Sequence, residues 1–64
     1  MTITSIGKYK TTQDLIIRFS IGIGTLPTGT IINVSQIDID NHKFYSDEIG
    51  DWHYYSIPCE KINN

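Results

Sequence analysis

Hydrophobic and polar residues alternate along short segments of this chain, with the period of two that is typical of β-strands. Residues 15–19 show this most clearly, because three apolar side chains fall on one face of a strand while Ile16 and Arg18 fall on the other. Residues 8–11 alternate in the same way. No segment has the 3.6-residue apolar period of an amphipathic helix. The pattern therefore predicts a protein built almost entirely of strands.

A turn that contains Pro27 and Gly29 precedes the longest predicted strand, residues 30–39. Pro27 presets the backbone angle φ for a turn, and Gly29 tolerates a positive φ. The apolar residues of the strand change phase near Ser35 and Gln36. Such a change indicates a β-bulge, the irregularity that bends sheets toward closure.

Three more strands are predicted in the second half of the chain, at residues 43–48, 52–57 and 61–62. Residues 40–42 and 50–51 are expected to form turns, because Asn, Asp and Gly tolerate left-handed backbone. Pro58 ends the second of these strands since it lacks the N–H group that a ladder requires. We expect residues 58–60 to form one helical turn.

Two segments carry a weaker pattern. Residues 1–7 lack a clean alternation, because Ile3 and Ile6 fall on opposite phases, and we expect a loosely held lead-in. Residues 20–24 contain two glycines, which predict an irregular loop or a bulged strand. Their G-x-G sequence lacks the third glycine and the following helix of a phosphate-binding loop, so a structural role is expected.

Composition supports the same fold class. The chain contains 13 Ile and 7 Thr but only 2 Leu and no Ala, the reverse of the usage in helices. Its 64 residues predict a single domain, 1–64, with a core of about residues 8–62. About five short strands at even spacing favour a small bent barrel, because two flat sheets would leave exposed edges. The prediction is an all-β, five-stranded barrel with one short helical turn near the C-terminus.

Residues 9–34, YKTTQDLIIRFSIGIGTLPTGTIINV, resemble the first half of bacterial SH3 domains. Residues 15–18 match three of the four positions of that family's L-N-V-R-like segment, and residues 24–30 match its turn. The sequence GDWHYYSIPCEKI, residues 50–62, is similar to the closing part of SH3-like folds. The resemblance implies an SH3-like barrel and ligand binding through a tyrosine and tryptophan groove. The family's polar segment after the arginine is replaced here by FSI, and its glycine-tryptophan pair near the end is absent.

The charge balance disfavours nucleic-acid binding. The net charge is −2, and the 5 basic residues are spread along the chain rather than clustered.

The single cysteine excludes an internal disulfide, and the lack of disulfides is typical of proteins in a reducing compartment. Charged residues interrupt the first twenty positions, so no signal peptide or membrane span is expected. We expect a cytoplasmic protein, and its richness in Ile, Asn, Lys and Tyr is typical of bacterial or phage accessory proteins from AT-rich genes.

An aromatic cluster is the most informative candidate site. In a strand, Trp52 and Tyr54 share one face, and His53 and Tyr55 share the other. A small barrel buries one face of this set and exposes part of the other. Exposed Trp and Tyr are enriched at binding surfaces. The cluster therefore predicts a contact surface for a partner.

The predicted core takes Phe44, Trp52 and Tyr54, so that Tyr45 and Tyr55 point outward from neighbouring strands. A reversed phase, with the Trp52 face as the contact surface, is the alternative. The predicted partner-binding residues are Tyr45, Glu48, Asp51, Trp52, His53 and Tyr55.

Metal binding, a cofactor and catalysis are not expected. Residues 38–42 alternate polar groups like a calcium loop, but Lys43 replaces the glycine and Ile49 the glutamate that such a loop requires. Neither histidine has a Cys or His nearby in sequence, which disfavours zinc. Cys59 and His53 are the nominal nucleophile and base, but nothing in a strand followed by a turn brings them together. Cys59 is expected to be a semi-buried small hydrophobe.

These features predict a free-standing, non-catalytic protein-interaction module that binds a peptide segment or a partner-protein surface. The acids beside the aromatics favour a basic or proline-containing partner. One alternative is a cell-wall or glycan-binding module, as the resemblance implies. Another is single-stranded nucleic-acid binding by stacking on the aromatics, which the weak positive charge disfavours.

Overall fold

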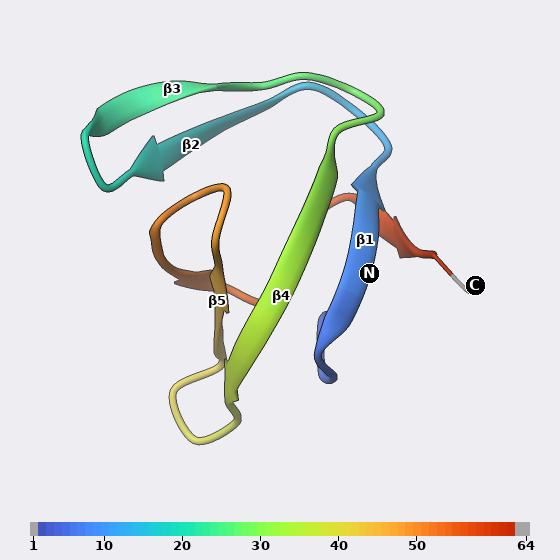
Figure 1. The fold of residues 1–64 in the computed structure, drawn as a ribbon, viewed down its shortest axis with the longest axis vertical. Coiled ribbons are helices and arrows are strands. Elements are labelled where there is room, and N and C mark those ends of the chain that lie inside the picture. The colour runs from blue at the N-terminus through green and yellow to red at the C-terminus, as the bar shows by residue number, and fades with distance from the viewer. Residues whose placement is uncertain (1, 63–64) are drawn as a thin grey trace.

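The computed structural model describes residues 2–62, so both ends of the predicted 1–64 domain lie outside the described residues. Figure 1 shows the arrangement of the strands. They are β1 (Gly7–Thr11), β2 (Leu15–Phe19), β3 (Gly22–Leu26), β4 (Ile31–Asp38), β5 (Lys43–Ser46), β6 (Asp51–Tyr54) and β7 (Cys59–Lys61). The all-β class is confirmed, and residues 2–62 contain no helix.

The strands form two antiparallel sheets. One has five strands in the order β6-β5-β4-β1-β7, and the other is the hairpin β2-β3. In Figure 1 the hairpin projects across the top of the five-stranded sheet. The predicted arrangement of five strands in a closed barrel therefore differs from the observed one, because seven strands are present and the two sheets do not join by hydrogen bonds.

The central strands agree with the sequence pattern. β4 pairs with β1 on one side and with β5 on the other. Its register shifts between Val34 and Gln36, which confirms the predicted bulge. The extra residue changes which face each later side chain occupies. Ile32 and Val34, before the bulge, are buried, and Ile37, on the opposite phase beyond it, also packs against the core.

The turn before β4 is held by a buried hydroxyl group. Thr11 Oγ1 donates to the Pro27 carbonyl over 2.7 Å and accepts the Thr30 N–H over 3.0 Å. The main-chain carbonyl of Thr11 also accepts the Gly29 N–H over 2.9 Å. Gly29 has a φ of 83°, so the predicted glycine turn is confirmed. Thr11 thereby fixes where the β2-β3 hairpin returns to the main sheet.

The glycine-rich segment, predicted as an irregular loop or a bulged strand, is a strand without a bulge, β3, preceded by a turn at Ser20 and Ile21. The reason is steric. The ring of Phe19 lies across Gly24, and a Cβ atom at that position would be 2.9 Å from the ring. The glycine therefore makes room for an aromatic ring rather than breaking the strand.

The predicted helical turn at residues 58–60 is also wrong, because Cys59–Lys61 form β7 along the free edge of β1. Lys10 and Glu60 lie directly opposite each other in this pair, and Lys10 Nζ is 3.5 Å from Glu60 Oε1. The pairing gives β1 a hydrogen-bonded neighbour on both sides, which an isolated helical turn would not.

The core is assembled from nearly every segment. Its buried hydrophobic members are Ile3, Tyr9, Ile17, Leu26, Ile32, Val34, Phe44, Ile49, Ile57 and Cys59. Ile3 is fully buried, and its N–H donates to the Tyr55 carbonyl over 2.6 Å. Residues 2–7 are therefore anchored at Ile3, contrary to the loose lead-in predicted for residues 1–7, of which Met1 lies outside the described residues. Cys59, predicted to be semi-buried, is buried, and burial raises the pKa of its thiol, which disfavours the nucleophilic thiolate.

Candidate functional site

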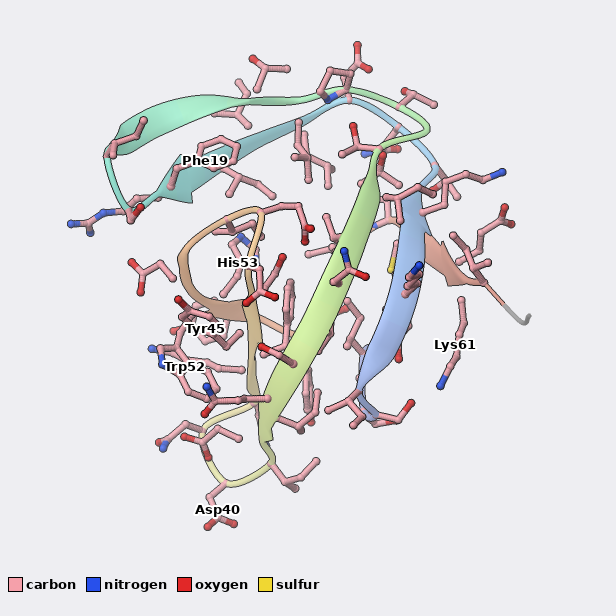
Figure 2. All side chains as sticks on the ribbon, in the orientation of Figure 1. Phe19, Asp40, Tyr45, Trp52, His53 and Lys61 are labelled. Carbon is pink, nitrogen blue, oxygen red and sulfur yellow. The ribbon has the colours of Figure 1, made fainter. Side chains whose placement is uncertain are left out.

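An aromatic face covers the outer side of β5 and β6. We use this name for Lys43, Tyr45, Trp52 and Tyr54. Trp52 pairs with Tyr45 and Tyr54 with Lys43 across the two strands. The rings of Tyr45 and Trp52 meet edge to face at 5.7 Å, and Figure 2 shows them next to each other beside β5. Lys43 Nζ lies 5.6 Å from the centre of the Tyr54 ring.

The prediction that Trp52 and Tyr54 belong to the core is wrong. Trp52 is 39% exposed and Tyr54 is 66% exposed. Phe44 is fully buried, as predicted, and its partner across the sheet is His53 rather than Trp52. Because opposite residues in antiparallel strands point to the same face, this register directs Trp52 and Tyr54 away from the core.

Tyr55 occupies a different environment from the aromatic face. It is half-buried and packs against the hydrophobic core. Its ring stacks on His42 with centres 5.2 Å apart, and its N–H donates to the His42 carbonyl over 3.0 Å. His42 has the one positive φ among the non-glycine residues of the described chain, at 58°. Tyr55 therefore closes the β4-β5 turn onto the core, which does not match the outward orientation predicted for it.

Two side chains of β6 bind main-chain groups at the edge of the five-stranded sheet. Asp51 Oδ1 accepts the Trp52 N–H over 2.7 Å, and His53 Nδ1 lies 2.8 Å from the Tyr54 carbonyl oxygen. Since a carbonyl only accepts, His53 Nδ1 carries the hydrogen of this bond. An open sheet edge is a template for another strand. These contacts engage the Trp52 N–H and the Tyr54 carbonyl, two of the main-chain groups that an added strand would use.

The carboxylate of Glu48 is engaged in hydrogen bonds within the protein. Its carboxylate accepts the Asn33 N–H over 2.6 Å, the Asn33 side-chain amide over 2.8 Å and the Ser46 hydroxyl over 3.1 Å. Partial burial raises its pKa, but these hydrogen bonds and one from its own N–H outweigh burial and leave the pKa below the ordinary value. Glu48 thus attaches the β5-β6 turn to β4. Its carboxylate is already occupied by three donors and is a poor candidate for partner contact.

An open pocket of about 420 Å³ lies beside the aromatic face, between the hairpin β2-β3 and the strands β5 and β6. It combines two cations, two carboxylates, two ring side chains and an amide. The lining residues are Arg18, Asp38, Asn41, Lys43, Asp51, Trp52 and His53. Of the predicted site residues, the structure therefore brings Asp51, Trp52 and His53 together here. Arg18 was not predicted, because β2 is far from β6 in sequence, and Lys43 was interpreted only as the start of a strand.

A second exposed apolar surface lies on the β2-β3 hairpin. Ile16 is 81% exposed, Ile23 is 79% exposed, and Ile21 at the turn is 98% exposed. The alternation at residues 15–19 predicted an outward Ile16. The positions of Ile21 and Ile23 had no such signal, because the segment was interpreted as an irregular loop or a bulged strand.

The metal-ligating side chains and the nominal Cys59 and His53 pair were the remaining candidate groups. Within residues 2–62, no group of three or more His, Cys, Asp and Glu side chains is arranged to hold a metal ion. Cys59 belongs to the core, whereas His53 lines the open pocket. No helix in the same range is long and apolar enough to cross a membrane.

Comparisons with protein-family models, with curated proteins and with solved structures find no match to this chain. The residues of the candidate site therefore carry the functional assignment, because one fold supports many functions.

Proposed function

We propose that this protein is a non-catalytic protein-interaction module that binds a peptide segment or partner surface through the aromatic face. The observation that carries the proposal is the exposure of Trp52 and Tyr54, 39% and 66%, on adjacent positions of one strand face. The few residues that dominate the binding energy of protein interfaces, each costing about 2 kcal/mol or more on truncation, are enriched in Trp and Tyr.

The side chains of this face are held in place before any partner arrives. Tyr45 supports the Trp52 ring from the neighbouring strand, and Lys43 lies against Tyr54. Ordering a free side chain on binding costs about 0.5–1.5 kcal/mol. Rings that are already fixed by cross-strand contacts lose less freedom, so more of the buried area contributes to affinity.

The charges around the face favour a protein partner over a nucleic acid. Asp38 and Asp51 line the pocket next to Trp52 and would repel a phosphate chain. The net charge of −2 acts in the same direction. The resemblance to bacterial SH3 domains stays a prediction for both the barrel and the glycan-binding role. It supports the same use of Tyr and Trp side chains for ligands.

A capture experiment tests the proposal. The immobilised protein is incubated with lysate of its source organism, and retained proteins are identified by mass spectrometry. The wild type is compared with the double variant Trp52→Ala/Tyr54→Ala and with the matched control Ile16→Ala/Ile23→Ala, which removes exposed apolar surface elsewhere. We expect at least one protein to be retained by the wild type and the control but lost from the aromatic variant. Identical retention by all three chains would contradict the proposal.

A further inference from the structure

The pocket beside the aromatic face contains two carboxylates that are already engaged by the chain itself. Asp38 Oδ2 accepts the Asn41 side-chain amide over 2.8 Å, and Asp38 Oδ1 accepts the Asn41 N–H over 3.2 Å. These bonds lower the pKa of Asp38, with smaller contributions from the Asp40 N–H and the charge of Lys43. Asp51 Oδ1 accepts the Trp52 N–H. Three of the four carboxylate oxygens therefore have a donor within the protein.

The two cations of the pocket, Arg18 and Lys43, have no oxygen partner within residues 2–62. Across residues 2–62, the guanidinium of Arg18 makes no hydrogen bond or ion pair, and the one salt bridge joins Lys10 to Glu60. The ammonium of Lys43 contacts the face of the Tyr54 ring and no oxygen at ion-pair distance. The unused hydrogen-bonding capacity of the pocket consists mainly of donors.

We propose that this pocket binds a carboxylate of an acidic peptide segment, with Arg18 as the principal ligand; the inference rests on the proposed function of the aromatic face. A guanidinium presents a planar fork that matches a carboxylate through two parallel hydrogen bonds. Lys43 adds a second positive charge, and the indole of Trp52 forms an apolar wall. The peptide residue next to the acid then packs on Trp52 and Tyr54.

The same geometry selects a single carboxylate rather than a chain of phosphates. Asp38 and Asp51 border the pocket, so each further anion beyond the first meets like charge. This partner is acidic, whereas the sequence had suggested a basic or proline-containing one. The difference arises because Glu48 and Asp51 accept hydrogen bonds from internal donors, while Arg18 joins the site from a distant strand.

The test uses a random peptide library displayed on phage and panned against the folded full-length chain. Binding of the enriched peptides is measured by isothermal titration calorimetry, because Trp52 is the single tryptophan of the chain and its variant has no indole fluorescence to follow. We expect enriched sequences to place an Asp or Glu beside an aromatic or aliphatic residue. Synthetic peptides with a free or an amidated C-terminus show whether the pocket binds a side-chain carboxylate or the terminal one. A second set, in which Asp or Glu is changed to Asn or Gln, measures the contribution of the side-chain charge.

Arg18→Gln should weaken binding of the acidic peptide about 10- to 100-fold, the range for hydrogen bonds to charged groups. The control Lys8→Gln removes the same unit of charge from β1, outside the pocket lining, and should change affinity less than about threefold. The amide peptide should bind wild type and Arg18→Gln equally, which isolates the pairwise interaction. Because Arg18 is exposed, its substitution should leave the melting temperature unchanged.

The possible failures are separable. Enriched peptides without acids that still lose binding to Trp52→Ala would overturn the carboxylate inference and leave the proposed function standing. Peptides whose binding does not respond to Trp52→Ala, or tighter binding of a single-stranded oligonucleotide than of any peptide, would overturn both. If Arg18→Gln and Lys8→Gln lost the same affinity for the acidic peptide, the net charge of the protein would explain the loss. That result would contradict a specific carboxylate site.

Discussion

Thr11→Val removes one buried hydroxyl group while keeping the shape of the side chain. Thr11 is 1% exposed, so no water replaces the missing group at its surface. The Thr30 N–H loses its 3.0 Å acceptor and keeps a longer bond of 3.2 Å to the Pro27 carbonyl. That carbonyl in turn keeps the Thr30 hydroxyl over 2.6 Å. The perturbation therefore weakens the turn between the hairpin and β4 without emptying the core.

The expected loss follows from these bonds. A buried polar group left without its partner costs about 1–3 kcal/mol. Thr30 and Pro27 retain other partners and avoid that full cost, so the loss comes from two hydrogen bonds of about 0.5–1.5 kcal/mol each, about 1–3 kcal/mol for the whole substitution. A chain of this length has a total stability of roughly 3–10 kcal/mol. Each kcal/mol lost lowers the melting temperature of so small a domain by about 4–8 °C.

Thermal and urea unfolding followed by circular dichroism measure this loss. The matched control is Thr25→Val, the same chemical change at an exposed position of β3. We expect the control to stay within about 0.5 kcal/mol of the wild type. If Thr11→Val were as stable as Thr25→Val, the hydroxyl would not hold the turn, and our explanation of how the two sheets are connected would be refuted.

Ile32→Ala empties a fully buried site and should cost about 2–4 kcal/mol in urea unfolding, whereas Ile21→Ser, at a 98% exposed position, should change stability by less than about 0.5 kcal/mol. Acid should destabilise the protein, because Asp14, Asp38 and Glu48 have lowered pKa values from hydrogen bonds present only in the folded state. The unfolded chain then binds more protons, so stability is full above about pH 4.5 and falls as the pH drops through the lowered values. Urea midpoints between pH 7 and pH 2 should show this fall, and Glu48→Gln should make it shallower; a midpoint that rises with acid would contradict the assignment.

Local alternation was enough to predict part of the fold. β2 is bounded by the same residues as the predicted strand, Leu15 and Phe19, and the bulge falls where the apolar residues of β4 change phase. In both places a single strand carries the signal, because burial of one face imposes a period of two. Longer-range pairing was not predictable in this way. β7 is a strand because the edge of β1 is available to it, which its own three residues do not encode.

The orientation of the aromatic strand could not be predicted for a related reason. Large apolar side chains occur at both phases of β6 and the residue after it, so alternation does not choose a face. Size favoured Trp52 as a core residue. The core volume was filled instead by Ile3, Ile49 and Ile57, which come from a predicted lead-in, the junction between a predicted strand and a predicted turn, and the end of a predicted strand. Competition for core volume is a property of the whole chain.

The candidate pocket shows the same limit. Asp51, Trp52 and His53 were predicted as neighbours because they are consecutive, and all three line the pocket. Arg18 lines it from β2, and only the packing of the hairpin against the main sheet brings it there. An outward arginine on an alternating strand is common and gives no indication of its neighbours.

The central claim is that the outer aromatic face binds the partner, and the affinity of Tyr54→Ala for a partner retained by the wild type tests it most directly. Tyr54 is 66% exposed, so its removal should leave the melting temperature within a few degrees of the wild type. The loss of its ring from the interface should weaken binding at least about fivefold, equivalent to more than about 1 kcal/mol. The companion variant Tyr55→Ala should show the reverse pattern, because Tyr55 packs on the core. Unchanged affinity of a folded Tyr54→Ala would contradict the account.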